Sequence, residues 1–225
     1  MFEDLSRFDF KTLFDVGCNV GDWSLMAAEH FPSATIHTFE LSNITYEVLA
    51  NTLNDQRFIN NNCGLSDAEG TIRYKDYGPE SKFNTLLGNA TYHDDHIKVT
   101  EREGLVRTGN AYCVEHGIES IDFLKVDVEG AEHMVLKGFS ELLSTQAIRA
   151  VQFEYGYTNG DAHFLMRDFY QLFEGFGYQV GKIHREGVQF QPWSYPLNNF
   201  KSGPNFLAVK STDSELIAAI AGKPI

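Results

Sequence analysis

A glycine-rich segment near the amino terminus is the first part of this chain whose residues could bind a ligand. Residues 15–21 read Asp-Val-Gly-Cys-Asn-Val-Gly and lie between an apolar segment and a helical pattern. Their spacing, Asp-x-Gly-x-Asn-x-Gly, differs from the Gly-x-Gly-x-x-Gly pattern of dinucleotide-binding folds. Gly17 and Gly21 let the backbone approach a ligand closely, and the N-terminus of the following helix offers it free N–H groups. We therefore expect a ligand site at this turn, with Asn19 as part of it.

Two carboxylates indicate which ligand the turn would bind. Asp15 precedes the glycines, and a carboxylate there suits a positive centre or a free amino group better than a pyrophosphate. Glu40 follows the next expected strand, roughly 20 residues past the turn, where such folds bind ribose hydroxyls. S-adenosylmethionine has a sulfonium centre, an amino group and a ribose. The alternative is an ordinary strand-to-helix turn in which Asn19 caps the helix.

Two further carboxylates end apolar segments later in the chain. Asp127 ends the segment 121–127, and Glu154 ends the segment 148–154. Ligands of open α/β sheets bind at the carboxyl ends of the strands, so we expect both side chains at the reaction centre. Lys125 lies on the same strand face as Asp127, and a structural ion pair between these two residues is the alternative interpretation.

If the ligand at the turn is S-adenosylmethionine, the expected reaction is methyl transfer, which requires two closely positioned reactants and exclusion of water. A hydroxyl acceptor would also need a base. The candidate bases are His133, His184 and Glu154, because histidine and buried carboxylates take up protons near neutral pH. A purely structural role is the alternative for each histidine. Asp127 and Glu154 could instead share a hard divalent cation through their oxygen atoms, although we expect no metal ligand in this chain.

Apolar segments and helical patterns alternate along the chain, which is typical of βαβ units with a parallel sheet. Strands are expected at 11–16, 34–39, 57–62, 121–127, 148–154, 178–184 and 204–210. Helices are expected at 21–31, 42–55, 109–117, 130–143 and 161–176. No helical pattern separates the last two strands, which should therefore be antiparallel. The predicted fold is α/β: a Rossmann-like class I methyltransferase fold with a seven-stranded, mostly parallel sheet, an antiparallel last strand and helices on both faces.

Two segments have no clear periodicity. Residues 66–74 are expected to form a small hairpin, and residues 75–107 a loop insertion that covers the acceptor. Within the latter, residues 93–96 read His-Asp-Asp-His; a metal site and a solvated loop are the two interpretations of this cluster. We expect a single domain over residues 1–225, with a short C-terminal helix at about 213–221.

The composition excludes several classes of function. The chain has 225 residues, and its net charge of −13 disfavours nucleic acid as a substrate. No apolar run is long enough to span a bilayer, and the N-terminus lacks a secretory signal pattern. Cys18, Cys63 and Cys113 show no metal-ligand spacing, which favours reduced thiols and a cytoplasmic location. A homo-oligomer is compatible with this sequence.

Four segments of the chain resemble the FkbM family of S-adenosylmethionine-dependent methyltransferases. They are residues 15–21, residues 39–40, residues 64–67 followed by Gly70, and residues 121–132 followed by Leu-Lys-Gly at 136–138. The third reads Gly-Leu-Ser-Asp, and the fourth, Ile-Asp-Phe-Leu-Lys-Val-Asp-Val-Glu-Gly-Ala-Glu, is the most specific. The resemblance covers about residues 12–157, with a weaker match at 203–207.

The resemblance implies S-adenosylmethionine as cofactor and a hydroxyl of a small molecule, sugar or glycan as acceptor. It adds Asp67 to the expected cofactor-binding residues and places Lys125, Asp127 and Glu129 where the methyl group is held. The chain departs from the family at 108–110, which read Thr-Gly-Asn, and at Leu41, where the family has proline. Only about ten residues precede the first expected strand, which implies an open substrate pocket. The alternatives are a non-catalytic methyltransferase-fold binding protein and, less favoured without Gly-x-Gly-x-x-Gly, a nicotinamide-dependent oxidoreductase.

Overall fold

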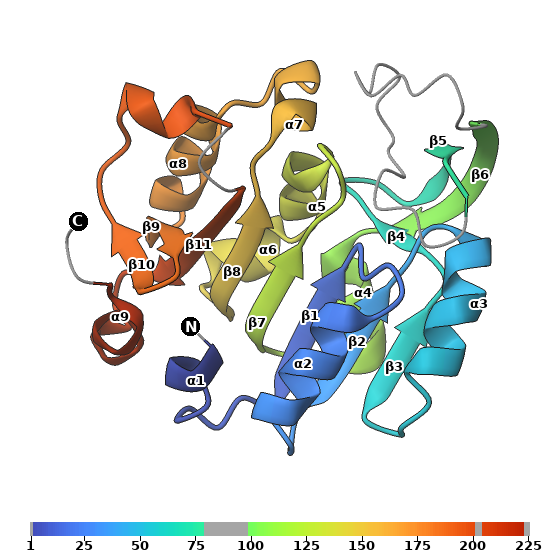
Figure 1. Ribbon diagram of the computed structural model, residues 1–225, viewed down its shortest axis with the longest axis horizontal. Helices are drawn as coiled ribbons and strands as arrows, with labels where there is room; N and C mark the ends of the chain where they lie inside the picture. Colours follow the sequence, from blue (N-terminus) through green and yellow to red (C-terminus); the bar gives the residue numbers. More distant parts are fainter. Residues whose placement is uncertain (1, 79–98, 201–203, 223–225) are drawn as a thin grey trace.

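The computed structural model describes residues 2–78, 99–200 and 204–222, and its centre is an eight-stranded sheet (Figure 1). The strand order is β10-β9-β11-β8-β7-β1-β2-β3. Five strands pair in parallel: β1 (Thr12–Val16), β2 (Thr35–Phe39), β3 (Phe58–Asn61), β7 (Ile121–Val126) and β8 (Ile148–Glu154). The antiparallel pairs involve β9 (Tyr178–His184), β10 (Gly187–Phe190) and β11 (Asn205–Lys210).

The predicted fold class is confirmed, and each of the seven expected strands is present. The expected number of strands is wrong by one, because β10 adds an edge strand that pairs with β9. This strand has only four residues and follows β9 after two turn residues, so it has no separate apolar segment in the sequence. The last expected pair, β9 and β11, is antiparallel as predicted. It is not a simple hairpin, since β10 and the 3₁₀ helix Tyr195–Asn198 lie between the two strands.

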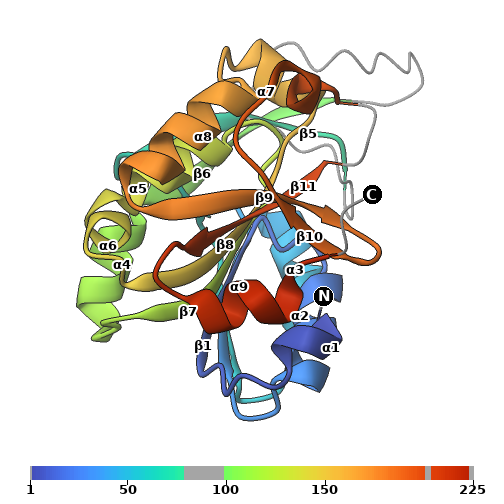
Figure 2. The ribbon, with the colours of Figure 1, turned by 90° about the vertical axis from the view of Figure 1, so that its left-hand side faces the viewer.

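Helices cover both faces of the sheet (Figure 2). One face carries α1 (Phe2–Leu5), α2 (Asp22–His30), α3 (Asn43–Thr52) and α9 (Ser214–Ile220). The other carries α4 (Gly109–His116), α5 (Glu132–Gly138), α6 (Ser140–Ser144) and α8 (Met166–Gly175). Successive residues of β1 point into different layers: Leu13 belongs to the apolar cluster under the first group, and Phe14 to the cluster under the second. The central strands are therefore apolar on both faces.

Two expected helices are divided in the structure. The helix expected at 130–143 is α5 and α6, which are separated at Phe139, whose fully buried ring contacts Phe14 at 6.0 Å between centroids. The helix expected at 161–176 is α8, preceded by the short helix α7 (Tyr157–Asp161). His163 lies between them with φ 55°, a left-handed conformation that cannot continue a helix.

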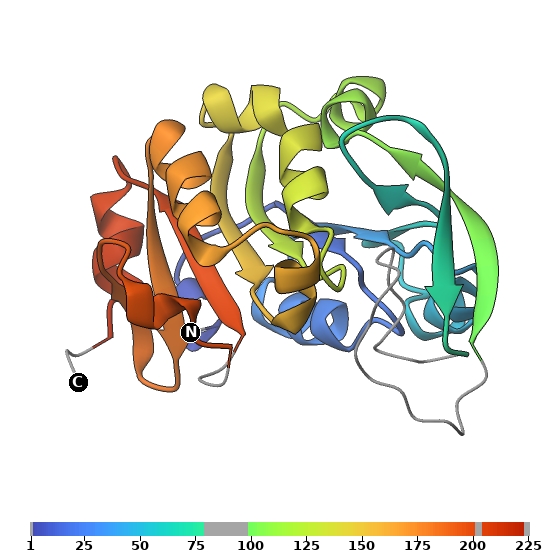
Figure 3. The same ribbon diagram turned by 90° about the horizontal axis from the view of Figure 1, so that it is seen from above.

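A second, three-stranded sheet lies at the α3 end of the molecule (Figures 1 and 3). Its order is β4-β6-β5, with β4 (Gly64–Leu65), β5 (Gly70–Asp76) and β6 (Thr100–Arg107). The expected hairpin within 66–74 is wrong, because β4 and β5 each pair with β6 and not with each other. The expected loop 75–107 is likewise too long, since β6 forms its last eight residues. Only Val106 of β6 is buried, so the strand lacks the apolar alternation that would have revealed it.

Residues 79–98 lie outside the described residues, and with them the His-Asp-Asp-His cluster at 93–96 and most of the segment expected to cover the acceptor. That role stays a prediction. No helix in the described part of the chain is both long enough and apolar enough to cross a membrane.

Candidate active site

A cavity of about 430 Å³ lies at the carboxyl ends of the central parallel strands. From β1 the chain adds β2 and then β3 on one side of the sheet, and it later adds β7 on the other side of β1. The strand order therefore reverses between β1 and β7, at the cavity. Open α/β sheets bind their ligands at this point, and the volume is within the range of small-molecule sites. Five of the ten predicted site residues line it: Gly17, Asn19, Glu40, Asp127 and Glu154.

The glycine-rich turn after β1 forms one wall of the cavity. Gly17 has φ 76°, and a Cβ atom added there would lie 1.8 Å from the carbonyl oxygen of Asp127. Close packing against the loop after β7 therefore requires glycine at position 17. Asn19, with φ 51°, lines the cavity, and its Oδ1 accepts a hydrogen bond from the backbone N–H of Val20 at 2.8 Å. Gly21 faces away from the cavity, because a Cβ there would meet Leu53 of the α3 layer at 2.9 Å.

Glu40 lies at the end of β2 and is 7% exposed. Its carboxylate accepts hydrogen bonds from the backbone N–H of Asn19 at 3.1 Å and of Ser42 at 2.8 Å. Burial raises the pKa of Glu40 to about 7, against the lowering effect of these two N–H donors. The side chain therefore joins the glycine-rich turn to the start of α3, where the hydroxyl of Ser42 accepts a hydrogen bond from the N–H of Thr45.

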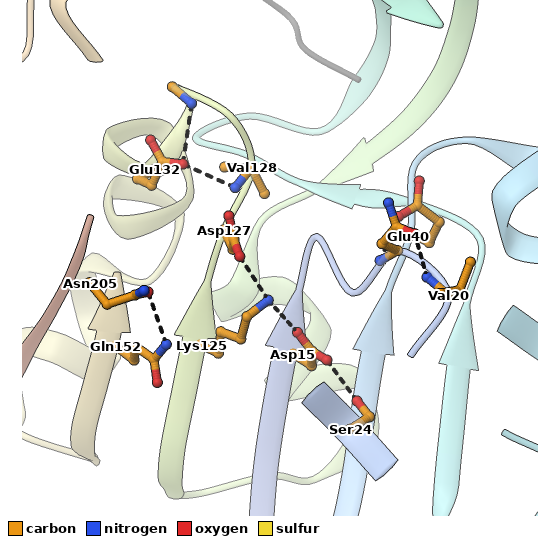
Figure 4. Close-up of polar contacts among 12 residues, drawn as sticks. Asp15, Val20, Ser24, Glu40, Lys125, Asp127, Val128, Glu132, Gln152 and Asn205 are labelled. Carbon is orange, nitrogen blue, oxygen red and sulfur yellow. Dashed lines mark hydrogen bonds and ion pairs between the residues drawn. The ribbon is translucent and has the colours of Figure 1, made fainter. Parts of the chain in front are cut away.

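Lys125 lies between two carboxylates (Figure 4). Its Nζ is 3.0 Å from Asp15, the residue beside it in the β1–β7 register, and 3.3 Å from Asp127. Burial opposes the charge of Lys125, but Asp15 and Asp127 outweigh it, so its pKa is raised. Asp15 is fully buried, is not among the lining residues, and its second oxygen accepts a hydrogen bond from the hydroxyl of Ser24 at 2.7 Å. Both of its oxygens are used within the protein, so Asp15 orients Lys125.

Three carboxylates converge on the opposite side of the cavity. Asp127, Glu129 and Glu154 each have an oxygen within 4.8 Å of the other two. Burial, followed by the charge of Asp127, raises the pKa of Glu129 to about 8 and that of Glu154 to about 9. Glu129 has φ 56°, an unusual conformation for this residue type. Such a group can hold a proton taken from a ligand, and its oxygen atoms are also of the kind that a hard divalent cation binds.

The remaining predicted residues lie outside the cavity lining. Asp67 is exposed on the surface after β4. His133 stacks on Phe164 at 4.9 Å between ring centroids, and burial lowers its pKa. His184 ends β9, which is separated from β8 by β11. Neither histidine is among the residues that line the cavity.

Sequence reasoning missed several polar and aromatic residues that line the cavity. Gln152 lies two residues before Glu154 on the same strand face, which is a signal that could have identified it. Its Nε2 donates a hydrogen bond to Asn205 at 3.2 Å. Asn205 pairs with Glu154 in the β11–β8 register, a relation that no local pattern reveals. Trp23 of α2 also lines the cavity, and its ring centroid is 6.0 Å from the Nζ atom of Lys125.

Comparisons with known proteins agree with this architecture. A sequence model described as the methyltransferase FkbM domain matches residues 15–180. Methyltransferase sdnD of Sordaria araneosa is 32% identical over 162 residues, which are 57% of this chain and 60% of that protein. The 31-O-demethyl-FK506 methyltransferase FkbM of Streptomyces tacrolimicus is 28% identical over 155 residues, which are 57% of this chain and 59% of that protein. The chain thus spans about three fifths of the length of the curated relatives it matches.

A solved structure has the same fold. The crystal structure of Methyltransferase FkbM from Methylobacillus flagellatus KT superposes with a TM-score of 0.56 at 16% identity, over 89% of this chain and 44% of that one. The likeness confirms the class I methyltransferase fold predicted from the sequence.

Proposed function

This chain belongs to the methyltransferase FkbM domain family, and we propose that it transfers a methyl group from S-adenosylmethionine to a hydroxyl group of a small molecule, sugar or glycan. The family implies the use of S-adenosylmethionine. The hydroxyl acceptor is supported by the 31-O-demethyl-FK506 methyltransferase, whose name specifies an O-methylation. The observation that carries the proposal is the convergence of the glycine-rich turn, Glu40 and Asp127 on one cavity within the matched region.

We assign the cofactor to the part of the cavity formed by the turn after β1 and the end of β2. The residues there fit its chemistry: Glu40 offers carboxylate oxygens to ribose hydroxyls, and the apolar side chains of Leu41, Leu65 and Val106 offer a surface to a purine ring. Both oxygens of Glu40 already accept one hydrogen bond each and retain lone pairs for another. When bound, S-adenosylmethionine supplies an electrophilic methyl group on a positive sulfur.

We assign the acceptor to the side of the cavity lined by Asp127, Glu129 and Glu154. The raised pKa of Glu154 means that it shares a proton with its neighbours at neutral pH, which leaves a carboxylate beside it free to accept one. Asp127 is the first candidate for this base, since it lines the cavity at the end of β7 and its carboxylate is 3.3 Å from Nζ of Lys125. The other role of the protein is to hold the hydroxyl close to the methyl group and to exclude water.

The test is a binding measurement followed by a transfer measurement. Calorimetry with S-adenosylhomocysteine is expected to show one site per chain. Labelled S-adenosylmethionine is then expected to transfer its methyl group to a member of a panel of sugars, glycans and polyketide alcohols. Absence of S-adenosylhomocysteine binding would overturn the cofactor assignment. Binding with no transfer to any acceptor would favour the alternative of a non-catalytic binding protein.

A variant of this mechanism places a divalent cation at the three carboxylates. It is supported by their ligand oxygens, which all lie within 4.8 Å of one another. Loss of transfer in a chelator, with recovery in magnesium, would support the variant. Transfer that is indifferent to the chelator would leave positioning and proton transfer as the only roles of these carboxylates.

A further inference from the structure

A buried pair of side chains, Glu132 and Asn159, joins the loop that contains Glu129 to the loop that follows Glu154. Glu132 is 0% exposed and Asn159 is 1% exposed. The Nδ2 atom of Asn159 donates a hydrogen bond to Oε2 of Glu132 at 2.6 Å. Neither residue lines the cavity, so neither is placed to touch a ligand.

The Glu132 side of the pair holds the loop after β7. Its Oε1 accepts hydrogen bonds from the backbone N–H of Val128 at 3.0 Å and of Gly130 at 3.2 Å (Figure 4). Between these two residues lies Glu129, whose φ of 56° is followed by a φ of 104° at Gly130. The glycine adopts its positive φ freely, but the left-handed conformation of a glutamate needs support from its surroundings, and the carboxylate of Glu132 supplies it.

The Asn159 side holds the loop after β8. Its Oδ1 accepts a hydrogen bond from the backbone N–H of Gly156 at 2.7 Å, two residues beyond Glu154. The intervening Tyr155 donates its N–H to the carbonyl oxygen of Pro204 at 2.7 Å. Through Asn159, the loop that follows Glu154 is thus connected to the loop that contains Glu129.

We propose that Glu132 and Asn159 are positioning residues, which set the separation of Glu129 from Glu154 across the acceptor side of the cavity. The inference rests on the proposed function for its catalytic meaning, because it assumes that these carboxylates face the acceptor. The coupling of the two loops does not depend on any ligand. A change at Asn159 must weaken the hydrogen bonds of the Val128 and Gly130 amides, which lie in the other loop.

Exchanging the two functional groups gives a sharp test. Glu132→Gln alone places an amide donor against the amide donor of Asn159, and Asn159→Asp alone places two carboxylates together. In the double variant Glu132→Gln/Asn159→Asp, the amide of residue 132 donates to the carboxylate of residue 159. The backbone N–H groups of Val128, Gly130 and Gly156 can then donate their hydrogen bonds to side-chain oxygens as in the parent. The matched control is Tyr178→Phe, which removes a buried 2.6 Å hydrogen bond to Ile148 at the opposite end of β8.

Amide hydrogen exchange on the full chain, followed by NMR, measures the coupling. Asn159→Asp is expected to accelerate exchange at Val128 and Gly130 by about tenfold or more relative to Tyr178→Phe, and the double variant to restore it. Unchanged exchange at these two amides in Asn159→Asp would overturn the proposal, as would failure of the double variant to restore it. If both single variants fail to fold, a folded double variant with native exchange at the two amides supports the pair, and an unfolded one overturns it.

Transfer kinetics separate positioning from general stability. Each single variant is expected to lower kcat by about 10- to 100-fold, with the KM for S-adenosylmethionine within about threefold of the parent, because only the acceptor side moves. The double variant should recover kcat. An equal loss of kcat in Tyr178→Phe would mean that Glu132 and Asn159 contribute only to general stability. A parent chain that does not bind S-adenosylhomocysteine refutes the proposed function, while the exchange experiment still decides the coupling of the two loops.

Discussion

The two sides of the cavity satisfy their carboxylates in opposite ways. On the β1–β2 side, Glu40 accepts hydrogen bonds from two backbone N–H groups, and the turn that it supports is closed by further backbone contacts. On the β7–β8 side, Asp127, Glu129 and Glu154 face one another, and their loops are held from behind by Glu132 and Asn159. The first side offers carboxylate oxygens that backbone N–H groups already bind. The second keeps three carboxyl groups close together, two of them with a pKa raised by burial and by the neighbouring carboxylates, which proteins do mainly at reacting centres.

This difference predicts opposite effects of substitution. Removing a group from the β1–β2 side should lower stability or cofactor affinity, because each group there is already satisfied. Removing a carboxylate from the β7–β8 side should lower activity and yet relieve repulsion, which is the usual relation between function and stability at active sites. The following predictions test the contrast, from the largest expected effect to the smallest.

Asp127→Asn should lower kcat by about 10²- to 10⁴-fold, the range of general acid–base catalysis. Affinity for S-adenosylhomocysteine, measured by calorimetry, should stay within about threefold, because the amide keeps the size of the side chain. Asp161→Asn is the matched control, since it makes the same change at an exposed residue of α7 that does not line the cavity. Full turnover in Asp127→Asn would remove this residue from the reaction.

Gly17→Ala should lower the free energy of unfolding by about 3 kcal/mol or more, because the added Cβ would lie 1.8 Å from a backbone oxygen that cannot rotate away. Thermal denaturation should show the loss, and S-adenosylhomocysteine binding should disappear with the distorted turn. Gly175→Ala is the control: among the residues that the structure describes, none lies within 4 Å of an added Cβ there, so the substitution should stabilise α8 by up to about 1 kcal/mol. Normal binding by Gly17→Ala would mean that the turn is not part of the cofactor site.

Glu40→Ala should weaken S-adenosylhomocysteine binding by roughly 1–3 kcal/mol through the loss of charge-assisted hydrogen bonds. The substitution also leaves the N–H groups of Asn19 and Ser42 without their partner, so a small loss of stability should accompany it. Glu47→Ala changes the net charge equally on the exposed side of α3 and should leave the affinity unchanged. An affinity of Glu40→Ala equal to that of the parent would reject the ribose assignment.

The same contrast explains what could be predicted from the sequence. The parallel strands were predictable because they are buried on both faces and read as continuous apolar segments, as Phe123 and Leu124 illustrate. The β1–β2 side was predictable because Gly17, Asn19 and Glu40 lie within one short stretch of chain. Expectations based on one residue alone were weaker: Asp15 precedes the turn that lines the cavity, yet its own side chain binds Lys125 and does not line it.

The β7–β8 side depends on contacts between distant segments. Asp127 and Glu154 were identifiable as strand ends, but the approach of Glu129 requires a backbone with positive φ that the sequence does not specify by itself. Asn205 lines the cavity beside Gln152, and Asn159 supports it from outside through Glu132; both relations are tertiary contacts. His133 is chemically suitable as a base, but it lies where its ring packs on Phe164. Residue type restricts the candidates for a catalytic role, and tertiary packing selects among them.

Glu154→Gln should stabilise the protein at alkaline pH, the smallest expected effect and the one that tests how far burial and the neighbouring carboxylates oppose the charge of Glu154. The pKa of Glu154 is about 9 in the folded state and near its ordinary value of 4.5 in the unfolded chain. Between these values the folded state binds a proton that the unfolded state lacks, so the contribution of Glu154 to stability falls as the pH rises. Glutamine binds no proton and removes this dependence. The melting temperature of Glu154→Gln should therefore exceed that of the parent by about 4 °C at pH 9, with a smaller difference at pH 6. Equal pH dependence in the two proteins would mean that neither burial nor the neighbouring carboxylates oppose the charge of Glu154 in the folded state. The contrast between the two sides of the cavity would then be one of position alone.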